Sequence, residues 1–221
     1  MTFDVIATGS CGNAVVLNKN ILIDCGVPFS KVKPYMKELY LVLLTHIHGD
    51  HFNPRAVRAL HRERSGLRWG CCEWMVAPLL EAGVDKRVID VYDPDIKAFE
   101  MYGPRISIRP ERLTHDVPNC GYHLLLTPEH GKRERIFYAT DTGTLDGVEA
   151  PGYDWYFIEA NHTKAELEER ARAKLDAGEF AYEIRAARNH LSQEQAEEWL
   201  YSQMGPHSQY VFLHQHTCKE G

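Results

Sequence analysis

Thr45-His46-Ile47-His48-Gly49-Asp50-His51 follows directly on the apolar run Leu39–Leu44. The run predicts a short buried strand, so these polar residues come where the strand ends. Alternate side chains of an extended segment point the same way, which lets His46 and His48 converge on one ion. Gly49 then permits a turn, so that Asp50 and His51 can face a second ion. The stretch therefore predicts a metal site at the end of a strand.

Other polar residues follow strand-like segments in the same manner. His115 comes after the segment 105–109, Asp141 after 135–138, and His214 after 211–213, while Glu159 ends the segment 155–159 and His190 lies in Asn189-His190-Leu191-Ser192. Near the start of the chain stand Gly9-Ser10-Cys11-Gly12-Asn13 and Ile21-Leu22-Ile23-Asp24-Cys25-Gly26.

Taken in order, these motifs resemble the metallo-β-lactamase fold hydrolases over nearly the whole chain, and one branch in particular, the small YycJ/WalJ-like metallohydrolases. The resemblance implies an α/β fold, a four-layer αβ/βα sandwich, in a single domain over residues 1–221. Periodicity alone indicates only that helices and strands are both present.

The resemblance also implies a ligand set for two divalent metal ions. His46, His48 and His115 would hold one ion, Asp50, His51 and His214 the second, and Asp141 would bridge both. Imidazole and carboxylate ligands suit zinc, with manganese as the alternative. Two neighbouring ions can activate water at neutral pH and stabilise a forming oxyanion. His216 is the rival of His214, which is preferred because it follows the final strand directly.

Three residues are predicted to act in catalysis. Asp50 can accept a proton as well as bind metal. In phosphodiesterase members of the family, a histidine at the place of His190 lies near the scissile phosphate and a glutamate at the place of Glu159 pairs with it, so His190 would protonate the leaving oxygen. The alternatives for His190 are a cap on the following helix or a metal ligand. Around the site, Asp24 could fix a histidine tautomer.

Asn161 and His162 are candidate substrate-binding residues, with a structural role for His162 equally open. The chain departs from the family in two places. Relatives have glycine where Asn189 stands, and their residues after the last metal-binding histidine differ from Gln215-His216-Thr217-Cys218.

Composition limits the class of protein. A net charge of −6 argues against broad electrostatic binding of nucleic acid, although the segment 53–64 is basic. That segment is either a solvated helix face or a rim that steers an anionic substrate. Without an apolar run long enough for a membrane span, or a signal-like start, we expect a cytoplasmic protein with no membrane partner and mostly free cysteine thiols.

The expected elements alternate along the chain. Strands are predicted at 3–8, 14–17, 21–24, 39–44, 87–91, 105–109, 122–126, 135–138, 155–159 and 210–214, and helices at 30–37, 54–64, 73–82, 163–177 and from Ser192 to about Ser202. Asn53 with Pro54 and Ser192 with Gln195 are the signals for two helix starts.

The sequence therefore predicts a binuclear metal-dependent hydrolase, most simply a phosphodiesterase or nuclease acting on DNA or other nucleic acid. The alternatives are a phosphodiesterase of small cyclic nucleotides, an acyl hydrolase of the lactonase or thioesterase type, and a metal-stabilised binding protein without turnover. The resemblance allows a homodimer, but no sequence feature decides it.

Overall fold

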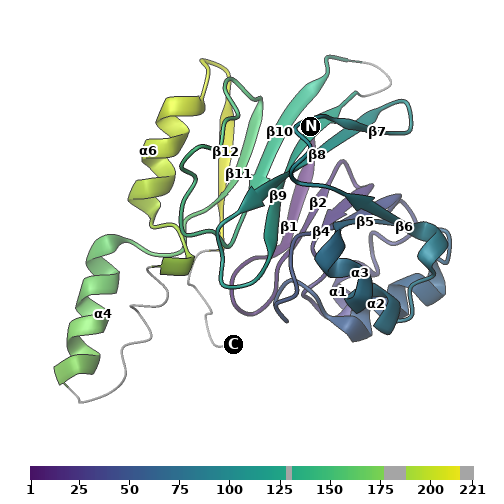
Figure 1. The fold of residues 1–221 in the computed structure, drawn as a ribbon, viewed down its shortest axis with the longest axis horizontal. Coiled ribbons are helices and arrows are strands. Elements are labelled where there is room, and N and C mark those ends of the chain that lie inside the picture. Colours follow the sequence, from purple (N-terminus) through teal and green to yellow (C-terminus); the bar gives the residue numbers. More distant parts are fainter. Residues whose placement is uncertain (128–130, 177–187, 215–221) are drawn as a thin grey trace. The chain divides into compact units, whose positions relative to one another are not determined.

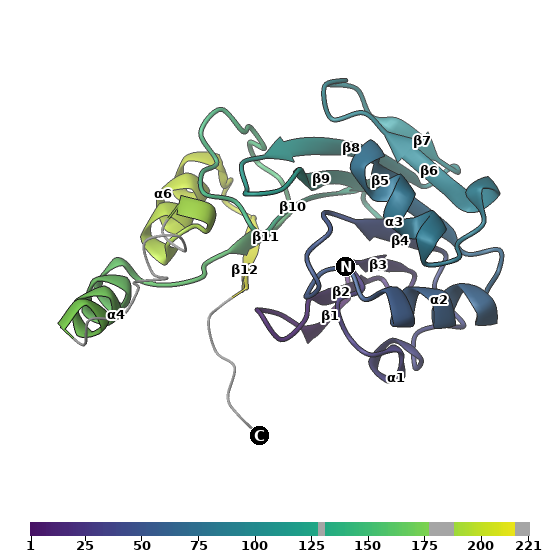
Figure 2. The same cartoon turned by 60° about the horizontal axis from the view of Figure 1, so that its bottom comes forward.

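The computed structural model describes residues 1–127, 131–176 and 188–214. They form two compact units, Met1–Ile96 and the described part of Lys97–His216. Each unit contains one six-stranded sheet, and Figures 1 and 2 together label the strands of both. No helix within the described ranges is long and apolar enough to cross a membrane. A single domain over 1–221 stays a prediction.

The sheet of the first unit places Asp24 and His46 at the ends of neighbouring strands. β3 pairs with β4 in parallel, so both strands end at the same edge. The parallel pairing continues through β5 and β6, whereas β1, β2 and β3 pair antiparallel. In sheet order the strands are β1 (Phe3–Ala7), β2 (Ala14–Leu17), β3 (Ile21–Ile23), β4 (Leu41–Leu44), β5 (Arg68–Cys72) and β6 (Ile89–Tyr92).

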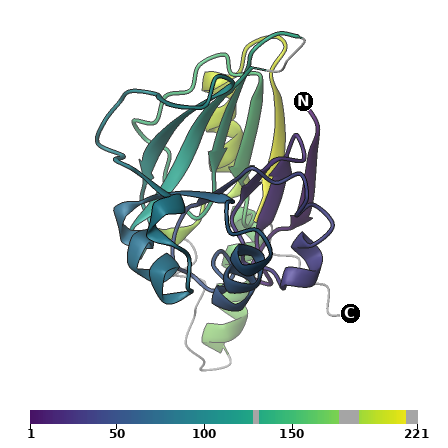
Figure 3. The same ribbon diagram turned by 90° about the vertical axis from the view of Figure 1, so that its right-hand side faces the viewer.

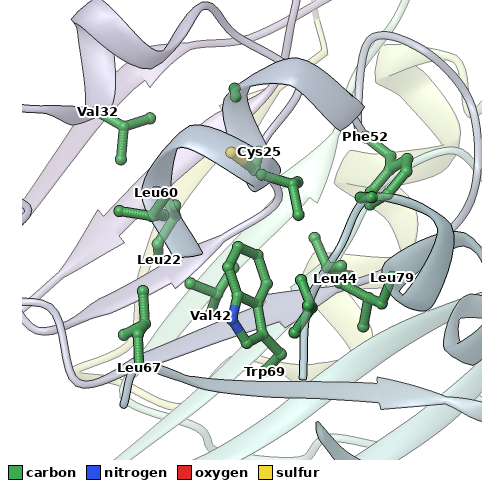
Figure 4. Packing of buried hydrophobic residues seen from close by; sticks show 14 of the residues in the cluster. Leu22, Cys25, Val32, Val42, Leu44, Phe52, Leu60, Leu67, Trp69 and Leu79 are labelled. Carbon is green, nitrogen blue, oxygen red and sulfur yellow. The ribbon is translucent and has the colours of Figure 1, made fainter. Parts of the chain in front are cut away.

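Three helices pack against this sheet, as Figures 1 and 2 show: α1 (Phe29–Val32), α2 (Pro54–Glu63) and α3 (Val76–Glu81). Two short 3-10 helices, Glu73–Met75 and Lys86–Val88, join the elements. Figure 4 shows Leu60 of α2 close to Trp69 of β5 and to Val42 of β4, all of them buried. This core holds β4, and with it the start of the His46 loop, in place.

Helix α2 begins as predicted. The Asn53 side chain accepts from the backbone N–H groups of the first turn, and Pro54 occupies the first position. Two arginines of the basic segment 53–64 also bind backbone carbonyl groups of other segments. Arg58 donates to carbonyl oxygens at the end of α3, and Arg64 donates to carbonyl oxygens of Met36, Lys37 and Leu39. The solvated-face interpretation agrees with the exposure of Arg55, Arg58 and Arg62, and the steering-rim interpretation stays a prediction.

The sheet of the second unit brings further predicted site residues to one edge. β10, β11 and β12 run parallel, so Asp141, Glu159 and His214 all lie at their carboxyl ends. The other pairs are antiparallel. In sheet order the strands are β12 (Gln209–Leu213), β11 (Trp155–Glu159), β10 (Glu134–Ala139), β9 (Asn119–Leu126), β8 (Ile106–Leu113) and β7 (Glu100–Tyr102).

Helices α4 (Lys164–Asp176) and α6 (Gln193–Gln203) belong to this unit. Figure 3 shows α6, in yellow, behind the strands, and its Ala196 and Leu200 join a core with Phe137 and Tyr156. Ser192 caps α6 in a capping box, as its sequence predicts. Position 177 of the predicted helix lies outside the described residues.

The differences from the predicted elements are local. The helix expected over 30–37 ends as α1 at Val32, because Pro34 has no N–H to continue the ladder. Strand β7 was not predicted, since three residues carry no clear alternation. Cys25, Cys71, Cys72 and Cys120 are buried and carry thiols outside any disulfide, which agrees with the expected thiols, whereas Cys11 is disulfide-bonded and the expectation of a thiol is wrong there.

Candidate metal centre

The first unit supplies a compact loop of possible ligands directly after β4. The ring centroids of His46 and His48 lie 4.8 Å apart, and those of His46 and His51 lie 4.2 Å apart. A backbone hydrogen bond of 2.9 Å from His51 N to His48 O closes the turn through Gly49. His46 and His51 are buried, whereas the Asp50 side chain is 23 % exposed. The loop thus gathers all four predicted ligands of this unit.

Asp24 orients the histidines of this loop. Its Oδ2 accepts from His51 Nδ1 at 2.7 Å, and its Oδ1 accepts from Thr45 N at 2.9 Å. The Thr45 hydroxyl lies 3.0 Å from both carboxylate oxygens and 3.0 Å from His46 Nδ1. A hydroxyl that donates to the carboxylate can accept from His46 Nδ1–H, so both rings keep Nε2 as the lone-pair nitrogen. This contact is the one that the predicted role of Asp24 requires.

Asn13 and Gly26 brace the same loop. Asn13 N donates to Asp50 O at 2.6 Å, and the Asn13 side-chain nitrogen lies 2.8 Å from His51 Nε2 and 3.1 Å from Gly9 O. If a metal ion were bound at His51 Nε2, the Asn13 amide would still donate to the carbonyl oxygens of Gly9 and Asp50. A Cβ on Gly26 would lie 1.7 Å from Asp50 O, so only glycine lets the two backbones approach this closely.

The second unit gathers four side chains whose ligand atoms lie within 4.8 Å of one another: Asp141, Glu159, His190 and His214. Asp141 and His214 each stand one or two residues beyond a parallel strand, with φ of 57° and 53°. Non-glycine residues rarely adopt these left-handed values, and such residues cluster at functional sites. Asp24 in the first unit, with φ of 61°, shares this conformation.

Glu159 is buried and surrounded by N–H donors. Its Oε1 lies 2.6 Å from His190 Nδ1 and 3.1 Å from His214 Nδ1, and its Oε2 accepts from Thr142 N at 3.0 Å and Leu191 N at 3.3 Å. A carboxylate offers about four lone-pair positions, and these donors occupy them. Glu159 is therefore suited to orient the two histidines, not to bind a metal ion.

The same contacts bear on the alternatives for His190. Burial raises the pKa of Glu159, but hydrogen bonds from His190 and His214 outweigh burial and hold it below its usual value. Burial lowers the pKa of His190, yet the Glu159 hydrogen bond and charge raise it overall. Its Nδ1 is committed to Glu159, which disfavours a metal ligand at that atom. The helix-cap alternative is wrong, because Ser192 caps α6.

Asp141 and His214 fit a common ion. Zinc bonds of about 2.0–2.2 Å at tetrahedral angles place two donor atoms roughly 3.3–3.5 Å apart. His214 Nε2 and Asp141 Oδ1 lie 3.5 Å apart, while His214 Nδ1–H faces Glu159. The donor set of one carboxylate and neutral imidazoles suits zinc or a similar divalent cation. His216, the rival of His214, lies outside the described residues.

His115 is held by a backbone group. Its Nδ1 lies 3.2 Å from Asn189 O, and its Nε2 lies 3.2 Å from an oxygen of Asp116. Because the carbonyl of Asn189 makes this contact, the replacement of the family's glycine by asparagine leaves it available. Its ring centroid lies 5.4 Å from that of His190.

Asn161 and His162, predicted to contact substrate, have other partners. The Asn161 amide donates to His214 O at 3.0 Å, which ties it to the turn that carries His214. His162 is buried, and its carbonyl accepts from Gln193 N at 2.8 Å at the start of α6. The structural alternative thus has direct contacts, and a substrate role for either residue stays a prediction.

A second cluster of charges lies in the same unit, outside the ligand set. Glu111 contacts His123 Nε2 and Arg109 at 3.2 Å each and also pairs with Lys97. His123 Nδ1 lies 3.0 Å from the Tyr153 hydroxyl. Burial raises the pKa of Glu111, but hydrogen bonds from His123 and Lys97 outweigh it and bring it to about 2. His123 is a buried member of this network.

Sequence reasoning did not single out Asn119, a structural role for Asn13, or Asp116 as a neighbour of His115. Asn119 donates to backbone oxygens of Thr140 and Asp141. The only available signal was a polar residue at the first position of a strand, which is common in proteins without such a contact.

Comparisons with known proteins agree with this architecture. A family model described as a β-lactamase superfamily domain matches residues 19–214. The structure resembles YhfI from Bacillus subtilis, a metallo-β-lactamase fold protein, with a TM-score of 0.67, 16 % identity and coverage of 97 % of this chain and 86 % of that chain. It also resembles the short form of human tRNase Z, with a TM-score of 0.66, 15 % identity and coverage of 97 % of this chain and 93 % of that chain. A diphosphatase of the PhnP family is similar as well, with a TM-score of 0.61, 15 % identity and coverage of 96 % of this chain and 86 % of that chain. No curated protein sequence matched. The predicted metallo-β-lactamase fold is confirmed.

Proposed function

Because this chain belongs to the β-lactamase superfamily, whose model covers residues 19–214, we propose that it is a binuclear metal-dependent phosphodiesterase that acts on nucleic acid. Two similar structures are named a tRNase and a diphosphatase, so phosphate-containing substrates occur on this fold. The resemblance of the sequence to YycJ/WalJ-like proteins favours DNA within this class.

We further propose that the family ligand pattern applies to this chain. His46, His48 and His115 would hold one ion, Asp50, His51 and His214 the other, and Asp141 both. When bound, the two ions would supply Lewis acidity and a water that is acidic enough to react near neutral pH. Each unit supports its share of this set, since Asp24 orients His51 and Glu159 orients His214.

The single observation that carries the choice of a phosphodiester is the 2.6 Å hydrogen bond between Glu159 and His190. It fixes the proton on Nδ1 and stabilises the imidazolium, whose Nε2–H can then donate to the leaving oxygen. The His190 side chain is 13 % exposed, so it can reach a ligand. Hydrolysis of thioesters and lactones does not call for a second acid of this kind. Asp50, also partly exposed, would accept the proton of the attacking water.

The size of the substrate is the open alternative within this proposal. The net charge is −6, and Arg58 and Arg64 bind backbone carbonyl oxygens of other segments, which leaves fewer cations to hold a long polyanion. A small cyclic nucleotide is therefore the second candidate. The net charge and the engaged arginines bear on the length of an anionic substrate, and they do not favour an acyl substrate over a phosphodiester.

The test begins with protein purified without chelators or an affinity tag. About two equivalents of divalent metal by mass spectrometry, with loss of metal and turnover in Asp141→Asn, are expected. Hydrolysis that survives both this substitution and chelation would overturn the mechanism, and absence of metal after reconstitution would overturn the assignment.

The role of His190 needs substrates that differ in their leaving group. A p-nitrophenolate ion leaves with little protonation, whereas the alkoxide of a nucleoside needs an acid. His190→Gln should therefore lower kcat on a thymidine dinucleotide by about 10²- to 10⁴-fold and on bis-p-nitrophenyl phosphate much less. The exposed His207→Gln is the matched control. Equal losses on both phosphodiesters would contradict an acid role, and faster turnover of p-nitrophenyl acetate than of either would favour acyl chemistry.

A further inference from the structure

We infer that Asn119 is a positioning residue that holds Asp141 in its left-handed backbone conformation and so aims the Asp141 carboxylate at the metal. The inference rests on the proposed function for the metal, but its backbone part does not. Asn119 is the first residue of β9, is 1 % exposed, and was not part of the predicted site.

The contacts are specific to the strained residue. Asn119 Nδ2 donates to Thr140 O at 3.0 Å and to Asp141 O at 2.7 Å. The first carbonyl belongs to the peptide group before Asp141 and the second to the peptide group after it. One amide thus fixes both peptide planes whose rotation defines φ and ψ of Asp141. With φ of 57°, this residue needs support that an ordinary strand end does not.

The chemistry of the position also singles out asparagine. Only a short side chain with two N–H donors on one nitrogen can bind both carbonyls. The amide cannot be turned round, because its oxygen would then face two carbonyl oxygens. Among the described residues, Asn119 Oδ1 is buried without a hydrogen-bond partner. A buried unpaired acceptor is unfavourable, so this amide is not explained as a general stabiliser of the sheet.

A second asparagine of the same unit makes a related contact, but with one carbonyl group only. Asn161 Nδ2 donates to the carbonyl of His214, which has φ of 53°. Both asparagines act on a residue that lies just beyond a parallel strand, and His214 Nε2 lies 3.5 Å from Asp141 Oδ1. If the Asp141 backbone relaxed toward negative φ, its Cβ would swing away and this spacing would be lost.

Asn119→Asp is the sharpest test, because it keeps the volume and removes both donors. We expect zinc affinity, measured on apo protein by competition with a chromophoric chelator, to fall by about 10- to 100-fold, as for other residues that orient metal ligands. Asn119→Ser retains one donor and no charge, and it should show a smaller loss if Asn119→Asp does not fold. Wild-type affinity in a folded Asn119→Asp or Asn119→Ser would overturn the inference.

The matched control is Thr140→Val. The Thr140 hydroxyl is buried without a partner in the described part of the chain, one residue before Asp141, so this near-isosteric change should leave zinc affinity unchanged. A loss equal to that of Asn119→Asp would show that any polar change there acts in the same way and would overturn the inference.

A metal-free measurement separates this inference from the proposed function. Thr142 N donates to Glu159 and Gly143 N to Thr114 O, directly after the clamped residue. In apo protein, amide exchange at Thr142 and Gly143 should be faster in Asn119→Ser than in Thr140→Val. Equal exchange would overturn the inference even if the wild type binds metal. Faster exchange in a protein that binds no metal would support the clamp and refute the proposed function.

Discussion

Replacing Gly143 by alanine should displace His190 and lower the rate of hydrolysis, although the added methyl group does not contact His190 itself. A Cβ at Gly143 would lie 2.1 Å from Arg188 O, whereas ordinary contacts begin at 3.4 Å. One of the two segments must therefore move by 3.4 − 2.1 = 1.3 Å. The Gly143 side is tied down by hydrogen bonds from Gly143 N to Thr114 O and from Thr142 N to Glu159. We therefore expect Arg188 and the residues that follow it, up to His190, to shift.

That shift would fall on the acid two residues later. The hydrogen bond of 2.6 Å from His190 to Glu159 would lengthen beyond hydrogen-bonding range if it absorbed most of the movement. A misplacement of about 1 Å in a catalytic group can cost about 10²-fold in rate. We therefore expect kcat on a thymidine dinucleotide to fall by about 100-fold, with an overpacking cost of about 1–3 kcal/mol in stability.

The assay compares Gly143→Ala with Gly66→Ala, whose added Cβ would meet nothing within 4 Å. Turnover on the dinucleotide, metal content and thermal unfolding are measured for both. Turnover of Gly143→Ala within about threefold of wild type would refute the reasoning. So would a loss of metal large enough to account for the loss of rate, since the effect would then not pass through His190.

Three further changes test other contacts. The pKa of Glu111, at about 2, lies below its ordinary 4.5, so its contribution is present above a pH of about 4.5 and is lost as the pH falls toward 2. Because Lys97 is exposed and solvent screens its charge, only part of this shift counts, and Glu111→Gln should lower the free energy of unfolding by about 2 kcal/mol at pH 7 and by much less at pH 3. Urea unfolding measures both values, and equal losses at the two pH values would contradict the reasoning. Gly26→Ala, whose Cβ would lie 1.7 Å from Asp50 O, should displace the ligand loop and lower metal content, whereas full occupancy would refute the close approach. Asp24→Asn replaces one of the two carboxylate oxygens, which accept hydrogen bonds from Thr45 and His51, by an NH2 group that cannot accept them. It should therefore weaken zinc binding by about 10- to 100-fold in a chelator competition, and an unchanged affinity would exclude an orienting role for Asp24.

Much of the site could be predicted because it obeys short-range rules. A polar residue directly after an apolar strand lies at a sheet edge, and parallel strands end at the same edge. Glu159 and His214 stand at such strand ends, although their roles were implied by the resemblance to the family, and β11 and β12 are parallel neighbours. The starts of α2 and α6 also follow from local signals, because a cap and the N–H groups that it binds are close in sequence.

The missing parts depend on contacts between distant residues. Asn119 acts on Thr140 and Asp141, more than twenty positions away, and nothing around it in the sequence announces that contact. Arg58 of α2 and Arg64 directly after it similarly bind carbonyl oxygens of other segments, and the local sequence does not reveal those partners. The left-handed backbone at Asp141 is equally hidden in the sequence, because aspartate tolerates this conformation but does not require it.

The left-handed conformation shared by Asp24, Asp141 and His214 changes how alanine scanning of this chain should be read. Alanine at such a position removes a functional group and also imposes a backbone preference against φ values near 60°, which aspartate tolerates better. The measured loss would mix the two effects. Asparagine, which enters this region readily, isolates the side-chain chemistry, while glycine isolates the backbone by releasing it. A pair of such substitutions at each position separates what the side chain binds from what the turn costs to build.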